Sequence, residues 1–158
     1  GLNIDNQVDL QARAEAMQKL LPGNNVPEIN LSDTNGKTIS VYDVNASYTV
    51  LFFWNTACEH CERAVPKLKE LYEKYHTKGF EIYAIAITPS ADVWKQMIIQ
   101  QNSPWINVSD IKGRESPLMT QFNLWSTPSF FILNKDKQIL ERPFNVESID
   151  NFLLNTLR

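Results

Sequence analysis

The chain has 158 residues, of which 43% are hydrophobic and 21% charged, and its net charge is −3. This length and composition fit one soluble globular domain with a real core. The weakly acidic balance, without a basic run, argues against nucleic acid or an anionic membrane as the partner. No apolar segment approaches the roughly 18 residues that would indicate a membrane span. Residues 1–5 lack the basic and apolar regions of a signal peptide, but the leading Gly1 indicates a trimmed or processed chain, so this says nothing about location.

An amphipathic pattern at the start of the chain predicts a helix over residues 5–21, ended by Pro22-Gly23. We assign residues 1–25 to an N-terminal helical extension and residues 26–158 to the main domain. The extension could pack on the domain, form the end of a linker or be the tail of a preceding domain.

The next part of the chain has the pattern of a hairpin followed by a βαβ unit. Two short strands are expected within residues 29–41, on either side of the Asn-Gly turn at residues 33–36. An apolar run rich in β-formers predicts a buried strand over residues 48–54. Apolar residues at helical spacing then extend to about His76, and a second strand over residues 80–87 should lie parallel to the first.

The second half continues with further alternating elements. A helix is expected to follow Thr88-Pro89-Ser90 and reach Gln101, and a short strand could cover residues 105–108. Ser116 and Pro117 are a good N-cap and first helical residue for a short helix. A strand after Pro128 should pair with residues 138–142, and a closing helix is expected over residues 146–157. The fold class is therefore α/β, with a mixed sheet covered by helices.

Two cysteines, Cys58 and Cys61, lie where the buried strand leads into the helix. A helix start favours negative charge, so Cys58 should be a stabilised thiolate, the form that attacks disulfides. Cys61, one turn further in, would then resolve the mixed disulfide. The alternative of a structural staple is weak, because so short a loop constrains the unfolded chain little. A zinc site would need more ligands than these cysteines with His60 and His76 provide, and no metal is expected.

Glu59 and His60, between the cysteines, should tune the redox potential in opposite directions. A protonated His60 would stabilise the Cys58 thiolate and make the disulfide more oxidising, whereas Glu59 would oppose this. The alternative for His60 is a solvent-exposed side chain with little effect.

Several motifs together resemble the thioredoxin superfamily. They are a strand ending in Phe53-Trp54, the C-x-x-C pair, Pro66 five residues later, and the run Ser126-Thr127-Pro128 that opens a β-rich segment. Residues 26–41 are similar to the N-terminal hairpin of the TlpA/ResA-like branch, with AhpC/TSA-Redoxin-like relatives. The resemblance covers roughly residues 26–157. It implies a thioredoxin-like fold with the helix and hairpin as an N-terminal extension, and a helical insertion between Thr88 and Leu124, before the proline strand.

The resemblance also implies a substrate-binding surface. Thr127-Pro128 is expected to be a cis bond that places the Thr127 backbone beside the dithiol, where it could pair with an extended substrate. An ordinary trans turn proline is the alternative, since proline is tolerated at a strand start. Trp54 and Trp125 are expected to be partly exposed aromatics near the site, although either could belong to the core.

At other positions the chain departs from the family pattern. Ala57 replaces the tryptophan usual before the first cysteine, Phe52 stands in place of the buried aspartate of thioredoxins, and Ala64 in place of the active-site glutamate of ResA-like proteins. No buried carboxylate base can be assigned, and Glu59, Glu62 or water could take the proton.

The leading hypothesis is a thiol–disulfide oxidoreductase that acts, through Cys58 and Cys61 and without a further cofactor, as a reductase of exported proteins. Its partners would be protein thiols or disulfides and an upstream electron donor, and the protein would be an extracytoplasmic monomer, touching a membrane only through an anchor absent from this sequence. The alternatives are an oxidase or isomerase, a non-catalytic binding module, and a thiol peroxidase. The peroxidase motif Pro-x-x-x-Thr-x-x-Cys is not met, because Leu51 and Asn55 occupy the Pro and Thr places.

Overall fold

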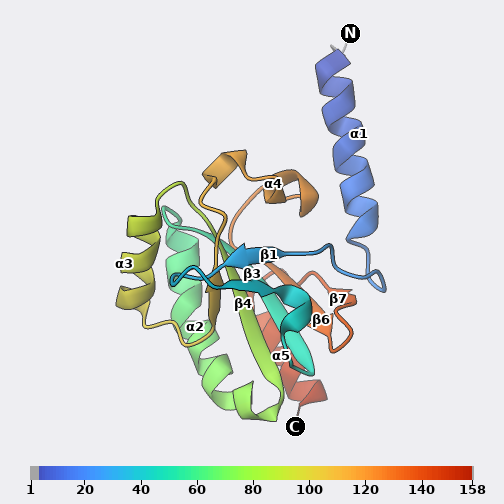
Figure 1. Ribbon diagram of the computed structural model, residues 1–158. Helices are drawn as coiled ribbons and strands as arrows, with labels where there is room; N and C mark the ends of the chain where they lie inside the picture. The colour runs from blue at the N-terminus through green and yellow to red at the C-terminus, as the bar shows by residue number, and fades with distance from the viewer. Residues whose placement is uncertain (1–3, 158) are drawn as a thin grey trace.

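The computed structural model describes the backbone of residues 4–157 and the side chains of residues 9–157. Its centre is a five-stranded sheet in the order β5-β4-β3-β6-β7 (Figure 1). β3, β4 and β5 are parallel, whereas β6 and β7 are antiparallel to their neighbours. The predicted α/β class with a thioredoxin-like mixed sheet is confirmed. The strands are β3 (Tyr48–Asn55), β4 (Phe80–Ile87), β5 (Ile106–Val108), β6 (Ser129–Asn134) and β7 (Ile139–Glu141).

The central strand is β3, which pairs along its length with β4 on one side and with β6 on the other. Every residue from Thr49 to Trp54 is buried. A strand with neighbours at both edges and cover on both faces needs an unbroken apolar run rather than alternation. This explains the unbroken apolar run from Val50 to Trp54 within β3.

Helices cover one face of the sheet and a mixture of hairpin, loops and short helices covers the other (Figure 1). The helices α2 (Glu59–Tyr75), α3 (Ala91–Gln101) and α5 (Val146–Thr156) contribute to the first face. On the second face lie the hairpin of β1 (Asn30–Ser32) and β2 (Thr38–Ser40) and the short helix α4 (Leu118–Gln121). Three 3₁₀ turns complete the described elements: η1 (Val41–Asp43), η2 (His76–Lys78) and η3 (Gly113–Glu115).

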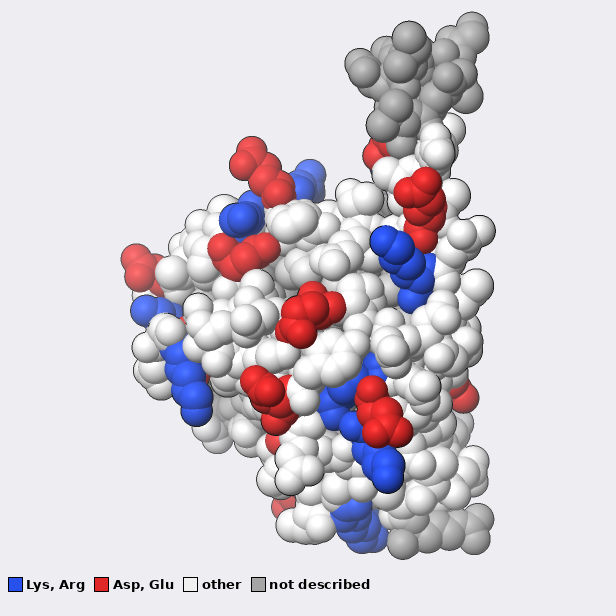
Figure 2. All heavy atoms as spheres, turned by 45° about the vertical axis from the view of Figure 1, so that its right-hand side comes forward, with Lys and Arg blue, Asp and Glu red and all other residues white. Residues whose placement is uncertain are grey.

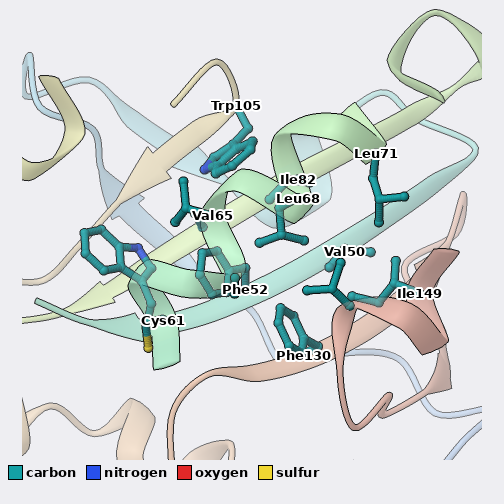
Figure 3. Close-up of a cluster of buried hydrophobic side chains, with 14 of the residues drawn as sticks. Val50, Phe52, Cys61, Val65, Leu68, Leu71, Ile82, Trp105, Phe130 and Ile149 are labelled. Carbon is teal, nitrogen blue, oxygen red and sulfur yellow. The ribbon is translucent and has the colours of Figure 1, made fainter. Parts of the chain in front are cut away.

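The core of the first face is drawn in Figure 3. Sheet residues such as Phe52 and Phe130 face the buried side of α2, and their rings stack with centroids 5.4 Å apart. Cys61 lies at the end of the same cluster, at the start of α2 (Figure 3). The second cysteine is thus a member of the core, whereas Cys58 is only packed against it.

The start of α4 differs from the prediction by one residue. The helix begins at Leu118, and Pro117 is its N-cap, without a capping hydrogen bond from its side chain. The Ser116 hydroxyl does accept a hydrogen bond from the Leu118 amide at 3.2 Å, but it also donates to Asp110. Ser116 is nevertheless extended, Pro117 already has helical backbone angles, and the Ser116 hydroxyl caps the Leu118 amide, so the expected capping role of Ser116 is confirmed although the assigned helix starts one residue later.

The N-terminal helix α1 (Ile4–Lys19) projects from the domain in Figure 1, although it contacts α4. Its apolar residues Leu10 and Met17 are exposed, so the predicted apolar stripe is not buried along its length. The segment after the helix is held firmly, because the Gly23 and Val26 amides donate to carbonyl groups of residues 137–139. The division into an N-terminal extension, residues 1–25, and a main domain stays a prediction. Residues 1–3 of this extension lie outside the described part.

Within the described residues, no helix is both long enough and apolar enough to cross a membrane.

Removing the ring of Phe52 should test the importance of the first core. Phe52→Ala is expected to lower the free energy of unfolding by about 3–5 kcal/mol, because it leaves a cavity beside Phe130. Ile99→Ala on the exposed side of α3 is the matched control, with a change within about 0.5 kcal/mol. Urea unfolding followed by fluorescence would measure both, and equal effects would show that this cluster does not form the core.

Candidate active site

The loop between β3 and α2 ends at Cys58, the residue directly before the helix. The Asn55 side-chain oxygen accepts from the Ala57 amide at 2.8 Å, and the Asn55 carbonyl accepts from the Cys58 amide at 3.1 Å. Asparagine favours such turns because its side chain can replace a backbone acceptor. Cys58 is then the N-cap of α2, and its sulfur accepts a hydrogen bond from the Cys61 amide at 3.2 Å.

The environment of Cys58 favours the thiolate. Partial burial by itself raises the pKa of this thiol, but hydrogen bonding with Cys61, with Thr127 and with the backbone amides of Cys61 and His60 outweighs it, so the pKa lies below the ordinary value. The amides belong to the first turn of α2, where N–H groups without helical partners favour an anion. The prediction that Cys58 is a stabilised thiolate at a helix start is therefore supported by its hydrogen bonds.

The environment of Cys61 has the opposite effect. Its side chain is 1% exposed. Burial, followed by the hydrogen bond with Cys58, raises the pKa of Cys61 to about 12. The apolar Phe52 belongs to the same buried cluster, in the place where thioredoxins carry an aspartate. The two thiols are thus unequal: one is prepared to attack, and the other is kept protonated.

Residues far apart in the sequence meet at the dithiol. The Thr127-Pro128 bond is cis, as expected from the resemblance. The Cys58 sulfur lies 3.4 Å from the Thr127 carbonyl oxygen, to which it donates a hydrogen bond when the thiol is protonated. The structure therefore places the Thr127 backbone beside the nucleophile, while a role for Thr127 and Pro128 in substrate binding stays a prediction.

A groove of about 690 Å³ runs beside this contact. It is bounded by the first turns of α2 and α5 and by the start of β6. His60, Trp125 and Pro128 lie along it, and so does Phe144. Trp125 is 63% and Phe144 94% exposed, so two large aromatic side chains flank the groove in water. This is the kind of concave, partly apolar surface that binds a ligand.

The expectation for Trp54 is wrong. The side chain is 1% exposed and stacks on Phe52 with ring centroids 6.4 Å apart. Because β3 is covered on both faces, Trp54 is enclosed although it lies one residue before the end of the strand. Trp54 supports the site from within the core and cannot contact a substrate, whereas Trp125 is exposed as expected.

The predicted tuning residues both face solvent. Glu59 has a side-chain exposure of 88% and lies 3.8 Å from Arg63. His60 is exposed and lies along the groove. In water such side chains act weakly on a neighbouring thiolate, so the alternative of a small effect fits the geometry of His60 better, and the exposure of Glu59 points the same way. Their influence on the redox potential stays a prediction.

Two arginines that the sequence did not single out also reach the site. The Arg13 guanidinium, from α1, lies 3.6 Å from the centroid of the Trp125 ring. Arg142, just after β7, donates to the Asn123 carbonyl at 3.0 Å. Neither contact has a local signal, since each joins segments distant in the chain. Among the described residues, no group of three or more His, Cys, Asp or Glu side chains is placed to bind a metal.

The sequence profile of the AhpC/TSA family matches residues 22–142. The chain belongs to the AhpC/TSA family. The thiol-disulfide oxidoreductase ResA of Bacillus thuringiensis (strain Al Hakam) is 29% identical over 125 residues, which cover 79% of this chain and 70% of the relative. This makes the chain a TlpA/ResA-like member of the thioredoxin superfamily.

Solved structures agree with this relationship. A domain of a possible thiol-disulfide isomerase from Cytophaga hutchinsonii has a TM-score of 0.78 and 34% identity, covering 86% of this chain and 92% of that one. A thioredoxin-like protein from Bacteroides caccae has a TM-score of 0.81 at 24% identity, covering 98% and 57% respectively, and supports the fold alone. Together with the relatives, the dithiol identifies the enzyme class as a thioredoxin-like thiol–disulfide oxidoreductase.

The unequal thiols predict selective alkylation of the reduced protein. With iodoacetamide near neutral pH, Cys58 should react and Cys61 should not, because only Cys58 has a lowered pKa. The rate of alkylation of Cys58 should rise with pH, and the pH at half of its maximum should lie below that of an ordinary cysteine. Mass spectrometry of peptides over a pH series would measure it, and equal labelling of both thiols would contradict the assignment.

Proposed function

We propose that this oxidoreductase works as a reductase of exported proteins, passing two electrons from the Cys58–Cys61 dithiol to a substrate disulfide. The observation that carries the proposal is the position of the Cys58 sulfur between the Cys61 amide, at 3.2 Å, and the Thr127 carbonyl, at 3.4 Å. One side stabilises the thiolate, and the other is backbone that an extended substrate could pair with.

The reaction would follow the ordinary course of thiol–disulfide exchange. The Cys58 thiolate attacks one sulfur of the substrate disulfide, and the other substrate sulfur leaves as a thiolate that takes up a proton. Cys61 then loses its proton and attacks Cys58, releasing the second substrate thiol and closing the Cys58–Cys61 disulfide. Two electrons and two protons pass to the substrate. An upstream dithiol donor returns the enzyme to its reduced form.

The surroundings of the two thiols bear on the direction of transfer. A strongly oxidising protein stabilises its dithiol form through a very acidic thiolate. Here burial opposes the lowering of the Cys58 pKa, and Cys61 is held as a thiol. Glu59 and His60 are exposed, and we expect them to add little. These features favour a reducing couple over an oxidase or isomerase.

The place of action proposed for the protein is outside the cytoplasm, as a monomer supplied with electrons by a membrane or soluble donor. The family relationship to ResA supports this proposal.

A thiol peroxidase is the weaker alternative. Leu51 is buried in β3 and Asn55 forms the loop turn, so neither place of the missing peroxidase motif holds a hydroxyl or proline.

Insulin reduction by dithiothreitol tests the activity. The wild-type protein should accelerate the precipitation of insulin chains, and Cys58→Ser should abolish the acceleration because it removes the attacking sulfur. After reduction and removal of dithiothreitol, Cys61→Ser should instead form a lasting mixed disulfide with insulin, visible on a non-reducing gel, because Cys58 can still attack but Cys61 is no longer there to displace the bound chain.

The same assay separates the alternatives. Equal activity of Cys58→Ser and wild type would leave only a non-catalytic binding module. Consumption of hydrogen peroxide that persists in Cys61→Ser, without reduction of insulin by the wild type, would indicate a thiol peroxidase.

A further inference from the structure

The Trp125–Thr127 segment lies between two hollows. The first is the groove of about 690 Å³ already described, which Pro128 and His60 border. The second, of about 460 Å³, is bordered by Asn55 and Thr127. Trp125 and Ser126 line both. Residues next to the Cys58–Thr127 contact thus line two separate depressions, Pro128 in the first and Thr127 in the second.

Every arginine whose side chain the structure describes lines one of these hollows. Arg63 and Arg142 line the first, and Arg13 and Arg114 line the second. Lys67 also lines the first, where it is paired at 2.9 Å with Glu147. Glu147 is the one acidic side chain among the described residues that line either hollow.

This concentration of positive charge stands out against the rest of the molecule. The whole chain has a net charge of −3. On the face shown in Figure 2, acidic and basic side chains are interspersed, without a broad field of either sign. The arginines therefore do not belong to a general basic surface. They gather at the site.

The guanidinium groups are held in different ways that leave donors available. Arg142 donates to a carbonyl group of the Asn123 loop and lies 4.6 Å from the centroid of Phe131, so it is fixed without a carboxylate partner among the described residues. Arg13 is stacked on Trp125 at 3.6 Å and paired with Asp9 at 3.1 Å. Arg63 is 68% exposed, and its only described ion pair is the 3.8 Å contact with Glu59. A guanidinium group with unused N–H donors is suited to bind a carboxylate through two hydrogen bonds.

We propose that the substrate is an extended polypeptide segment with aspartate or glutamate residues on both sides of its reactive cysteine. The inference rests on the proposed function, because the cysteine must reach Cys58. A small anion would need one cluster of donors, whereas these arginines are distributed over two hollows that share the Trp125–Ser126 segment, next to the Thr127 contact with Cys58. An extended chain passing Thr127 can place carboxylates in both. The helix α1 then has a role, since it supplies Arg13 to the second hollow.

The chemistry of the exchange is unchanged by these contacts. Cys58 forms a disulfide with the peptide cysteine while the other peptide leaves as a thiol, and Cys61 then displaces the bound peptide as a second thiol. The arginines act on association, because exposed charges of opposite sign raise the rate of encounter and lose this effect as salt screens them. The carboxylates should therefore matter most at low ionic strength.

Disulfide-linked homodimers of three matched peptides test the proposal. Each peptide carries one central cysteine, flanked on both sides by glutamate, glutamine or lysine. The rate constant for oxidation of the reduced protein is measured by tryptophan fluorescence or by quenching with acid. For the wild type at low salt, the glutamate peptide should react about tenfold faster than the glutamine peptide, and the lysine peptide should be slowest. About tenfold is the low end of the rate enhancements that electrostatic steering produces. The advantage should shrink in 0.5 M salt.

Charge reversal then asks whether the arginines are responsible. The variant Arg63→Glu/Arg114→Glu changes two exposed side chains, one at each hollow. The matched control is Lys37→Glu/Lys95→Glu, which changes the net charge equally at exposed positions away from both hollows. The readout is the ratio of the glutamate-peptide rate to the glutamine-peptide rate within each variant, so a general loss of activity cancels. The ratio should fall below one in the arginine variant and stay near the wild-type value in the control.

The outcomes separate the inference from the function on which it rests. If the wild type reduces none of the peptides faster than Cys58→Ser does, the proposed function fails. If it reduces all three at equal rates, the function stands and the acidic substrate is overturned. A preference for glutamate that persists in the arginine variant, or falls equally in the lysine control, would also overturn the role of the arginines.

Discussion

The hydrogen bond from the Cys61 amide to the Cys58 sulfur is the contact on which the rest of the site depends. It forms only if Cys58 is the N-cap of α2, and this requires the helix to begin directly after the strand–loop junction. Asn55 makes that junction short by closing the turn at the end of β3. The buried central strand and the amphipathic helix therefore act together, since the strand fixes where the chain leaves the sheet and the helix supplies the amides.

The same arrangement makes the two thiols unequal. The first turn of α2 places Cys58 at the surface and Cys61 inward, against the cluster that contains Phe52. Water and amide donors reach the sulfur of Cys58, and apolar burial keeps the sulfur of Cys61 protonated. An aromatic ring in place of a carboxylate strengthens the core and removes a local proton acceptor. The resolving step must then pass its proton to the substrate, to an exposed side chain or to water.

Much of the fold could be predicted from periodicity and turn residues. β4 covers the expected residues 80–87, and the Asn-Gly turn separates β1 from β2 as expected. The dithiol could be located because strand and helix patterns meet there, but its contact with Thr127 was expected only from the resemblance to a family. Trp54 was misplaced because an apolar strand end does not reveal whether solvent reaches it. The contacts of Arg13 and Arg142 could not be foreseen, since they join distant segments and leave no local pattern.

The reduction potential of the Cys58–Cys61 couple tests the central claim most directly. Equilibration with dithiothreitol or glutathione buffers, followed by trapping of free thiols, would measure it. The account predicts one reversible two-electron couple near the reducing end of the superfamily range, toward roughly −270 mV. A potential near roughly −120 mV would contradict a reductase, and failure of the two sulfurs to form a reversible disulfide would contradict the site itself.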